Sequence, residues 1–213
     1  MSDASSPFPS APPDDPGQAL VSLRTRRLQL RPLRPEDHRL LYRLALDPDV
    51  TFDWRLRGTT PSFEEFQRQI HPSVLCQFAV SPIGSMELFG LVVAFSADLR
   101  NRFCHAGVVM RPELRRRGLG IEAIFGLSRY LFTGWDFRLV LLETTGRTFA
   151  HVASMEKAGI VTVEGRIRDQ YYFGGRYWDG IILTHRRQQF DALMASRLGR
   201  SLLLPGRPVV RTR

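Results

Sequence analysis

The fold is decided by the stretch Val108-Val-Met-Arg-Pro-Glu-Leu-Arg-Arg-Arg-Gly-Leu-Gly-Ile-Glu-Ala123. An apolar run gives way to an arginine-rich turn with two glycines, and an amphipathic helical pattern begins at once. Glycine lets the backbone approach a ligand closely, and the free N–H groups at the start of a helix attract anions. Arginine side chains pair well with phosphate oxygens. The turn is therefore predicted to hold a phosphorylated ligand.

Two common phosphate loops can be compared with this turn. A P-loop requires Gly-Lys-Ser/Thr, and isoleucine and glutamate follow Gly120 instead, which excludes it. The dinucleotide fingerprint fits formally as Gly118-x-Gly-x-x-Ala123. That fingerprint begins directly at the end of a strand, however, and Gly118 lies eight residues beyond Met110. A plain surface turn before a helix is a further alternative.

The spacing Arg115-x-x-Gly118-x-Gly120 resembles the pyrophosphate loop of the GNAT acyltransferases, whose ligand is acetyl-CoA. Other segments resemble the RimJ/RimL-type branch of N-terminal and small-amine acetyltransferases, and they occur in the same order. They are an opening strand at 23–33, helix starts at 35–37 and 62–65, a helix–loop region at 47–54 and a last hairpin at 164–179. The resemblance implies an α+β, three-layer GNAT fold with a mixed, mostly antiparallel sheet flanked by helices.

Composition limits the class of protein. The 213 residues suit a disordered Pro-rich tail at 1–20, one GNAT domain at 21–185 and a basic C-terminal extension at 186–213. No apolar run has the length of a membrane span and no signal peptide is apparent, so we expect a cytoplasmic protein without membrane contact. Cys76 and Cys104 lack metal spacing, so no metal is expected.

The chain carries a formal net charge of +9, and Lys157 is the only lysine among its 30 basic residues. We interpret the preference for arginine as a coding bias. Nucleic-acid binding by the basic C-terminal segment is the less favoured interpretation, because neither interleaved aromatic residues nor a known binding module accompanies it. The sequence is compatible with a homodimer and does not decide the oligomeric state.

The resemblance implies direct transfer of an acetyl group from acetyl-CoA to a primary amine, on a protein N-terminus or a small molecule. In the family, the strand equivalent to residues 107–110 binds the pantetheine arm, and one of its backbone N–H groups can stabilise the oxyanion. The cofactor-binding candidates are therefore Val108, Val109, Met110, Arg115, Arg116, Arg117, Gly118, Leu119, Gly120 and Thr148.

Two histidines are the catalytic candidates. His105 lies two residues before Gly107, where many RimJ/RimL-type enzymes have a glutamate. His151 and Thr148 occupy the positions of the branch's Asn-x-x-Ser motif, and Met155 replaces the tyrosine that many GNAT enzymes use as an acid. A histidine can accept a proton near neutral pH. The alternative is structural, with His105 facing solvent on a strand and His151 paired with a carboxylate on a helix.

Aromatic residues gather in the regions that frame the acceptor site in the family. Trp54 and Tyr172 are predicted to line the acceptor pocket, and Asp53 and Asp169 are candidate carboxylates for a cationic amine. Two other functions stay open: transfer of a different acyl group, and a catalytically degenerate domain that binds CoA or only a protein partner. The intact Arg-Gly loop favours ligand binding, whereas Met155 leaves room for the degenerate domain.

Overall fold

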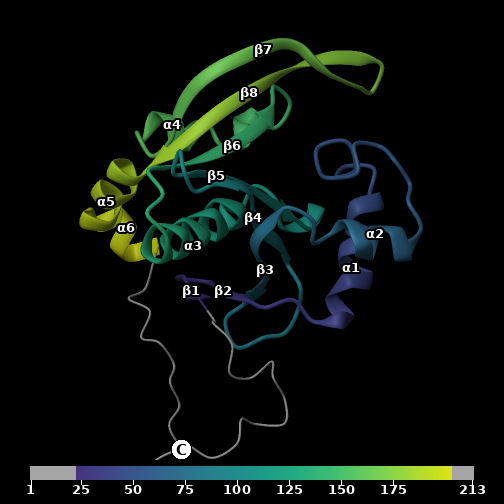
Figure 1. Cartoon of the computed structure of the whole chain (residues 1–213), viewed down its shortest axis with the longest axis horizontal. Helices are drawn as coiled ribbons and strands as arrows, with labels where there is room; N and C mark the ends of the chain where they lie inside the picture. The colour runs from purple at the N-terminus through teal and green to yellow at the C-terminus, as the bar shows by residue number, and fades with distance from the viewer. Residues whose placement is uncertain (1–22, 203–213) are drawn as a thin grey trace, which may run out of the picture.

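The computed structural model describes residues 23–202, so the predicted tail at 1–20 and the last part of the basic extension lie outside the described residues. The chain folds around one eight-stranded sheet (Figure 1). Its elements are, in chain order, β1 (Leu23–Arg24), β2 (Leu28–Arg31), α1 (Pro35–Leu46), α2 (Phe63–Gln69), β3 (Val74–Pro82), β4 (Gly90–Asp98), β5 (Phe103–Met110), η1 (Pro112–Leu114), α3 (Leu119–Gly134), β6 (Leu139–Thr145), η2 (Phe149–His151), α4 (Ala153–Lys157), β7 (Thr162–Phe173), β8 (Arg176–Arg186), α5 (Arg187–Ala195) and α6 (Arg197–Leu202).

The sheet is mixed, with the strand order β1-β2-β3-β4-β5-β6-β8-β7. Every neighbouring pair is antiparallel except β5 and β6, which run parallel. One face packs against α3, α4 and α5, and the other face packs against α1 and α2. The helices therefore form layers on both sides of the sheet (Figure 1), which confirms the predicted fold class.

The structure departs from the predicted elements in three places. The expected strand at 23–33 is divided into β1 and β2, because the chain turns at Thr25, whose N–H donates to the Leu28 carbonyl at 2.9 Å. The sequence pattern also predicts a helix at about 149–158, and the structure divides it into η2 and α4. The last hairpin is much longer than predicted, and β7 carries register shifts between Val163 and Gly165 and between Ile167 and Tyr171.

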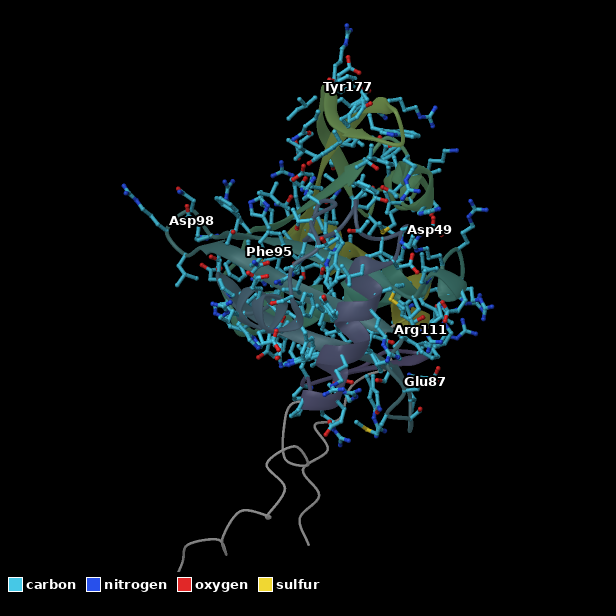
Figure 2. All side chains as sticks on the ribbon, turned by 90° about the vertical axis from the view of Figure 1, so that its right-hand side faces the viewer. Asp49, Glu87, Phe95, Asp98, Arg111 and Tyr177 are labelled. Atoms are coloured by element: carbon cyan, nitrogen blue, oxygen red, sulfur yellow. The ribbon has the colours of Figure 1, made fainter. Side chains whose placement is uncertain are left out.

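The hairpin of β7 and β8 extends well beyond the rest of the sheet. Tyr177 lies close to its far end (Figure 2), and the chain turns there through Gly174 and Gly175, which both have positive φ. Figure 1 shows the hairpin curving toward the segment that joins α1 to α2. No helix within residues 23–202 combines the length and the apolar character required to cross a membrane.

His185 on β8 is fully buried, and it makes stability depend on pH. Its Nδ1–H donates to the Ile160 carbonyl at 2.7 Å, and its Nε2 has no hydrogen-bond partner among the described residues. Three aromatic rings surround the imidazole: those of Phe125, Phe132 and Phe190. Burial lowers the pKa of His185 below its ordinary value of 6.5.

The free energy of unfolding should therefore fall as the pH drops below about 6.5, because the unfolded chain then binds a proton that the folded chain excludes. Urea unfolding at about pH 7.5 and about pH 5.5 measures this dependence. His185→Gln keeps an N–H donor but cannot titrate, so it should reduce the difference between the two values. The slope that remains is expected from His38 and His151, whose pKa values are also lowered. A variant with the wild-type pH dependence would contradict the assignment.

Candidate active site

The site begins where the two parallel strands of the sheet separate. β5 and β6 pair from Phe103 with Leu139 as far as Ala106 with Leu142. Both strands continue beyond the last pair, β5 to Met110 and β6 to Thr145. A cavity of about 720 Å³ opens between them and is lined by residues 106–110 and 142–145. The separation leaves this edge of β5 without a strand partner, so its backbone groups face the cavity.

The arginine-rich loop brings the start of α3 to the same cavity. Arg116 and Gly118 have φ values of 62° and 71°, so two residues of the loop adopt the left-handed conformation before the helix begins at Leu119. The N–H of Glu122 donates to the Gly118 carbonyl at 3.1 Å. The N–H groups that precede it in the first turn of the helix have no helical acceptor and can receive an anion. A Cβ at Gly120 would lie 3.5 Å from the Met110 side chain, an ordinary contact, so the start of α3 packs against the end of β5.

A buried carboxylate holds this loop in place. Glu122 is 0% exposed and accepts from the Thr25 hydroxyl at 2.6 Å and from both the backbone N–H and the Nε–H of Arg27 at 2.7 Å. The same guanidinium donates to the Arg117 carbonyl at 3.0 Å. Because a buried charge is costly unless it is paired, Glu122 fixes α3 and the loop against the segment between β1 and β2.

One end of the cavity is strongly cationic. A smaller hollow of about 320 Å³ adjoins it and is lined by Asp49, Pro112, Arg115, Arg116, Arg147, Thr148 and His151. Two of its arginines, Arg115 and Arg147, donate to the Asp49 carbonyl at 3.1 and 3.3 Å. Burial lowers the pKa of His151, and the neighbouring arginines lower it further. The arginines therefore carry the positive charge at this end of the cavity, which makes it a candidate site for an anion.

The other end of the cavity holds two carboxylates in different environments. Asp53 forms an ion pair with Arg147 and accepts from the Thr145 hydroxyl at 3.4 Å. Glu143 on β6 accepts a hydrogen bond from the Tyr171 hydroxyl on β7. Both carboxylates and Tyr171 line the cavity, together with Trp54 and Arg57.

Aromatic rings join the segment after α1 to the long hairpin beside this end. The rings of Phe52 and Phe173 stack with centroids 5.7 Å apart, and Phe173 stacks on Trp178 at 5.3 Å. The Arg147 guanidinium lies 5.1 Å from the Phe173 ring. This stack explains why the hairpin bends toward the segment between α1 and α2 (Figure 1).

The structure gathers most of the predicted site residues around the one cavity. It is lined by Trp54, His151 and nine of the ten cofactor candidates: Val108, Val109, Met110, Arg115, Arg116, Gly118, Leu119, Gly120 and Thr148. Arg117 does not line it, since its backbone carbonyl is held by Arg27. Met155 lines the cavity as well, and its thioether cannot donate the proton that a tyrosine would supply.

Two predicted residues lie elsewhere. The ring of His105 lies between those of Phe95 and Phe103, at 5.6 and 6.0 Å, and His105 is not among the residues that line the cavity. Phe95 and Asp49, which lines the cationic hollow, lie on opposite sides of the view in Figure 2. Tyr172 is 63% exposed and packs on Tyr177 rather than on the cavity.

The sequence did not identify four residues that line the cavity. Arg57, Glu143 and Tyr171 lie at the end that holds the two carboxylates, which we call the acceptor end, and Arg147 borders both ends. Adjacent residues of a strand face opposite sides of the sheet. Tyr171 therefore lines the cavity, and Tyr172, the predicted residue, faces away from it. Glu143 could have been found from strand register, because it is the next residue after Leu142, which pairs with Ala106. No local signal marks Arg57 and Arg147 as neighbours of this site.

The two cysteines are poor nucleophiles. Burial raises the pKa of Cys76 to about 11. Burial, and then the neighbouring Cys76, raise the pKa of Cys104 to about 12. Both side chains therefore remain thiols at neutral pH, and the thiolate is the reactive form.

Several known structures share this fold. The structure of spermidine N-acetyltransferase from Vibrio cholerae, in complex with CoA and spermine, aligns with a TM-score of 0.66 and 22% identity, covering 76% of this chain and 97% of that one. A probable GNAT-family acetyltransferase from Chromobacterium violaceum aligns with a TM-score of 0.64 and 19% identity, covering 90% and 96%. Comparison with curated protein sequences gave no match.

At these identities the structural likeness supports the fold alone. The sequence itself matches the family model of the acetyltransferase (GNAT) domain over residues 27–161. That match includes the arginine-rich loop, both separating strands and the first turn of α3. The chain therefore belongs to the GNAT acetyltransferase family.

Proposed function

We propose that this protein is an N-acetyltransferase that moves an acetyl group from acetyl-CoA directly to the primary amine of a small molecule. The observation that carries the proposal is the single cavity in which separated strands, an unpaired helix start and a cluster of arginines meet. A long ligand with phosphates at one end and a reactive group at the other fits this arrangement. The Vibrio cholerae enzyme was solved in complex with CoA and spermine, which are such a cofactor and a small amine.

The two ends of the cavity suggest how acetyl-CoA would bind. The pyrophosphate would accept hydrogen bonds from backbone N–H groups of 116–120, with Arg115 and Arg116 adding charge. The pantetheine arm would follow the unpaired edge of β5 at Val108–Met110. The thioester would then lie near the point where β5 and β6 separate, beside Gly107 and Leu142.

Acetyl transfer at that point requires a base for the amine and a hydrogen-bond donor for the oxyanion. The amine nitrogen attacks the thioester carbonyl, the C–N bond forms, the C–S bond breaks, and the nitrogen loses a proton while the departing thiolate gains one. A backbone N–H on the free edge of β5 would stabilise the oxyanion. We retain His105 and His151 as the proposed bases; His105 acts through a bridging water, since its ring lies outside the cavity lining.

A second candidate function is a domain that binds CoA without catalysis. The replacement of the usual acidic tyrosine by Met155 and the position of His105 away from the cavity favour it. Turnover of acetyl-CoA with a panel of amines separates the two functions, because a non-catalytic domain would bind the cofactor and release no CoA. A protein N-terminus as acceptor and a longer acyl group are tested by the same assay with peptides and with other acyl-CoA donors.

Gly120→Asp should abolish acetyl-CoA binding while the fold survives. The new carboxylate would lie at the start of α3, where the pyrophosphate is proposed to bind, and would repel it. We expect the affinity measured by calorimetry to fall by roughly 100-fold or more. Gly165→Asp is the matched control, since its Cβ would meet nothing within 4 Å on β7. Wild-type affinity in a folded Gly120→Asp variant would disprove the cofactor site.

His105→Ala tests the proposed base. If His105 accepts the proton, kcat/KM should fall by roughly 10²–10⁴-fold, and acetyl-CoA affinity should hold. His105→Glu, which introduces the commoner residue of the RimJ/RimL-type branch, should recover part of the rate. An unchanged rate in His105→Ala would show that this residue only packs between Phe95 and Phe103, and would make His151 the next residue to test.

A further inference from the structure

Tyr171 contacts two side chains of opposite charge, Glu143 and Arg57. Its hydroxyl donates to the Glu143 carboxylate, and the Arg57 guanidinium lies 4.6 Å from the centre of its ring. All three side chains line the large cavity, and they come from β6, β7 and the segment between α1 and α2. A carboxylate and a guanidinium are therefore fixed on one aromatic side chain at the acceptor end.

Glu143 lies on β6 next to the proposed position of the thioester. It is the first residue of β6 beyond the last pair with β5. It lies on the same strand face as Thr145, whose hydroxyl donates to Asp53 from the segment after α1. Within residues 23–202 Glu143 forms no ion pair, whereas Asp53 is neutralised by Arg147. Of the two carboxylates that line the large cavity, Glu143 is thus the one whose charge is free for an ammonium group.

Arg57 presents a free cation on the other side of Tyr171. It is exposed, and the described part of the chain offers its guanidinium no carboxylate partner. Its backbone has a φ of 50°, in the left-handed region that is costly for a residue with a side chain. Gly58 follows with a φ of 87°, and its N–H donates to the Thr51 carbonyl at 3.1 Å. The turn thus places Arg57 at the cavity although its backbone adopts an unfavourable left-handed conformation.

We propose that the acceptor is a small zwitterionic amine of the α-amino acid type. Its ammonium group binds Glu143 beside the separation of β5 and β6, and its carboxylate binds Arg57. This inference rests on the proposed acetyl transfer and narrows its acceptor. A polyamine fits poorly, because a second ammonium group would meet the Arg57 guanidinium. Tyr171 is a positioning residue, since it orients both charged groups.

Matched acceptors test the role of Arg57. The assay compares L-phenylalanine, L-methionine and L-glutamate with their α-carboxamides and with spermidine, using the full chain and acetyl-CoA. A carboxamide keeps the amine and the size of the acceptor and removes one negative charge. The acids should show a kcat/KM roughly 10–100-fold above that of their amides, as a charge-assisted hydrogen bond to arginine implies. Spermidine should be the poorest acceptor.

Variants assign the two charges. Arg57→Gln should remove the preference by slowing the acids alone, and Glu143→Gln should slow acids and amides alike. Tyr171→Phe keeps the ring and loses the hydroxyl, so it should raise KM for every acceptor more than it lowers kcat. Arg168→Gln and Tyr177→Phe, both exposed on the same hairpin and outside the cavity, are controls that should behave as wild type. Calorimetry with acetyl-CoA checks that each variant is folded.

The outcomes separate the inference from the proposed function. Equal rates for acids and amides, or a preference for spermidine, would overturn the zwitterionic acceptor and leave acetyl transfer standing. An equal loss for acids and amides in Arg57→Gln would show that this residue only shapes the turn, and would also overturn the inference. No acetylation of any acceptor by a protein that binds acetyl-CoA would overturn the proposed function itself.

Discussion

The separation of two parallel strands is the constraint on which the site depends. It stays open because each strand is fixed on its other side: β5 pairs with β4 as far as Met110, and β6 pairs with β8 as far as Thr145. Neither strand can move to close the gap without breaking these ladders. The gap then provides unpaired backbone on β5, and α3 begins at its mouth because the loop after β5 is held there by Glu122.

Local patterns in the sequence predicted the parts of the fold that depend on local chemistry. Two glycines and an apolar period of helical spacing were sufficient for the loop and α3. The division of β1 from β2 could not be predicted in this way. It depends on Thr25 and Arg27 binding Glu122, which is far away in the sequence and hidden within a helix.

The same distinction between local and distant contacts applies to the candidate site. Most of its cofactor end is built from the continuous segment 108–120, so the resemblance of that one segment to the family's loop was sufficient to identify those residues. Its acceptor end is assembled from residues near 53–57, 143–147 and 171, and it could not be read from any one of them. Tyr171 reaches the cavity in place of Tyr172 because β7 is irregular just before it, between Ile167 and Tyr171. A single-sequence pattern contains no information about such a shift.

The irregularity of β7 also affects the free edge of the sheet. β7 is the last strand of the sheet, so one of its sides presents unpaired backbone groups over a long stretch. A flat, apolar edge of that length would be a template for uncontrolled strand addition and polymerisation. Here the two shifts bend the edge, and Arg166 and Arg168 place charge along it. The same distortion that precedes Tyr171 therefore makes this edge a poor template for strand addition.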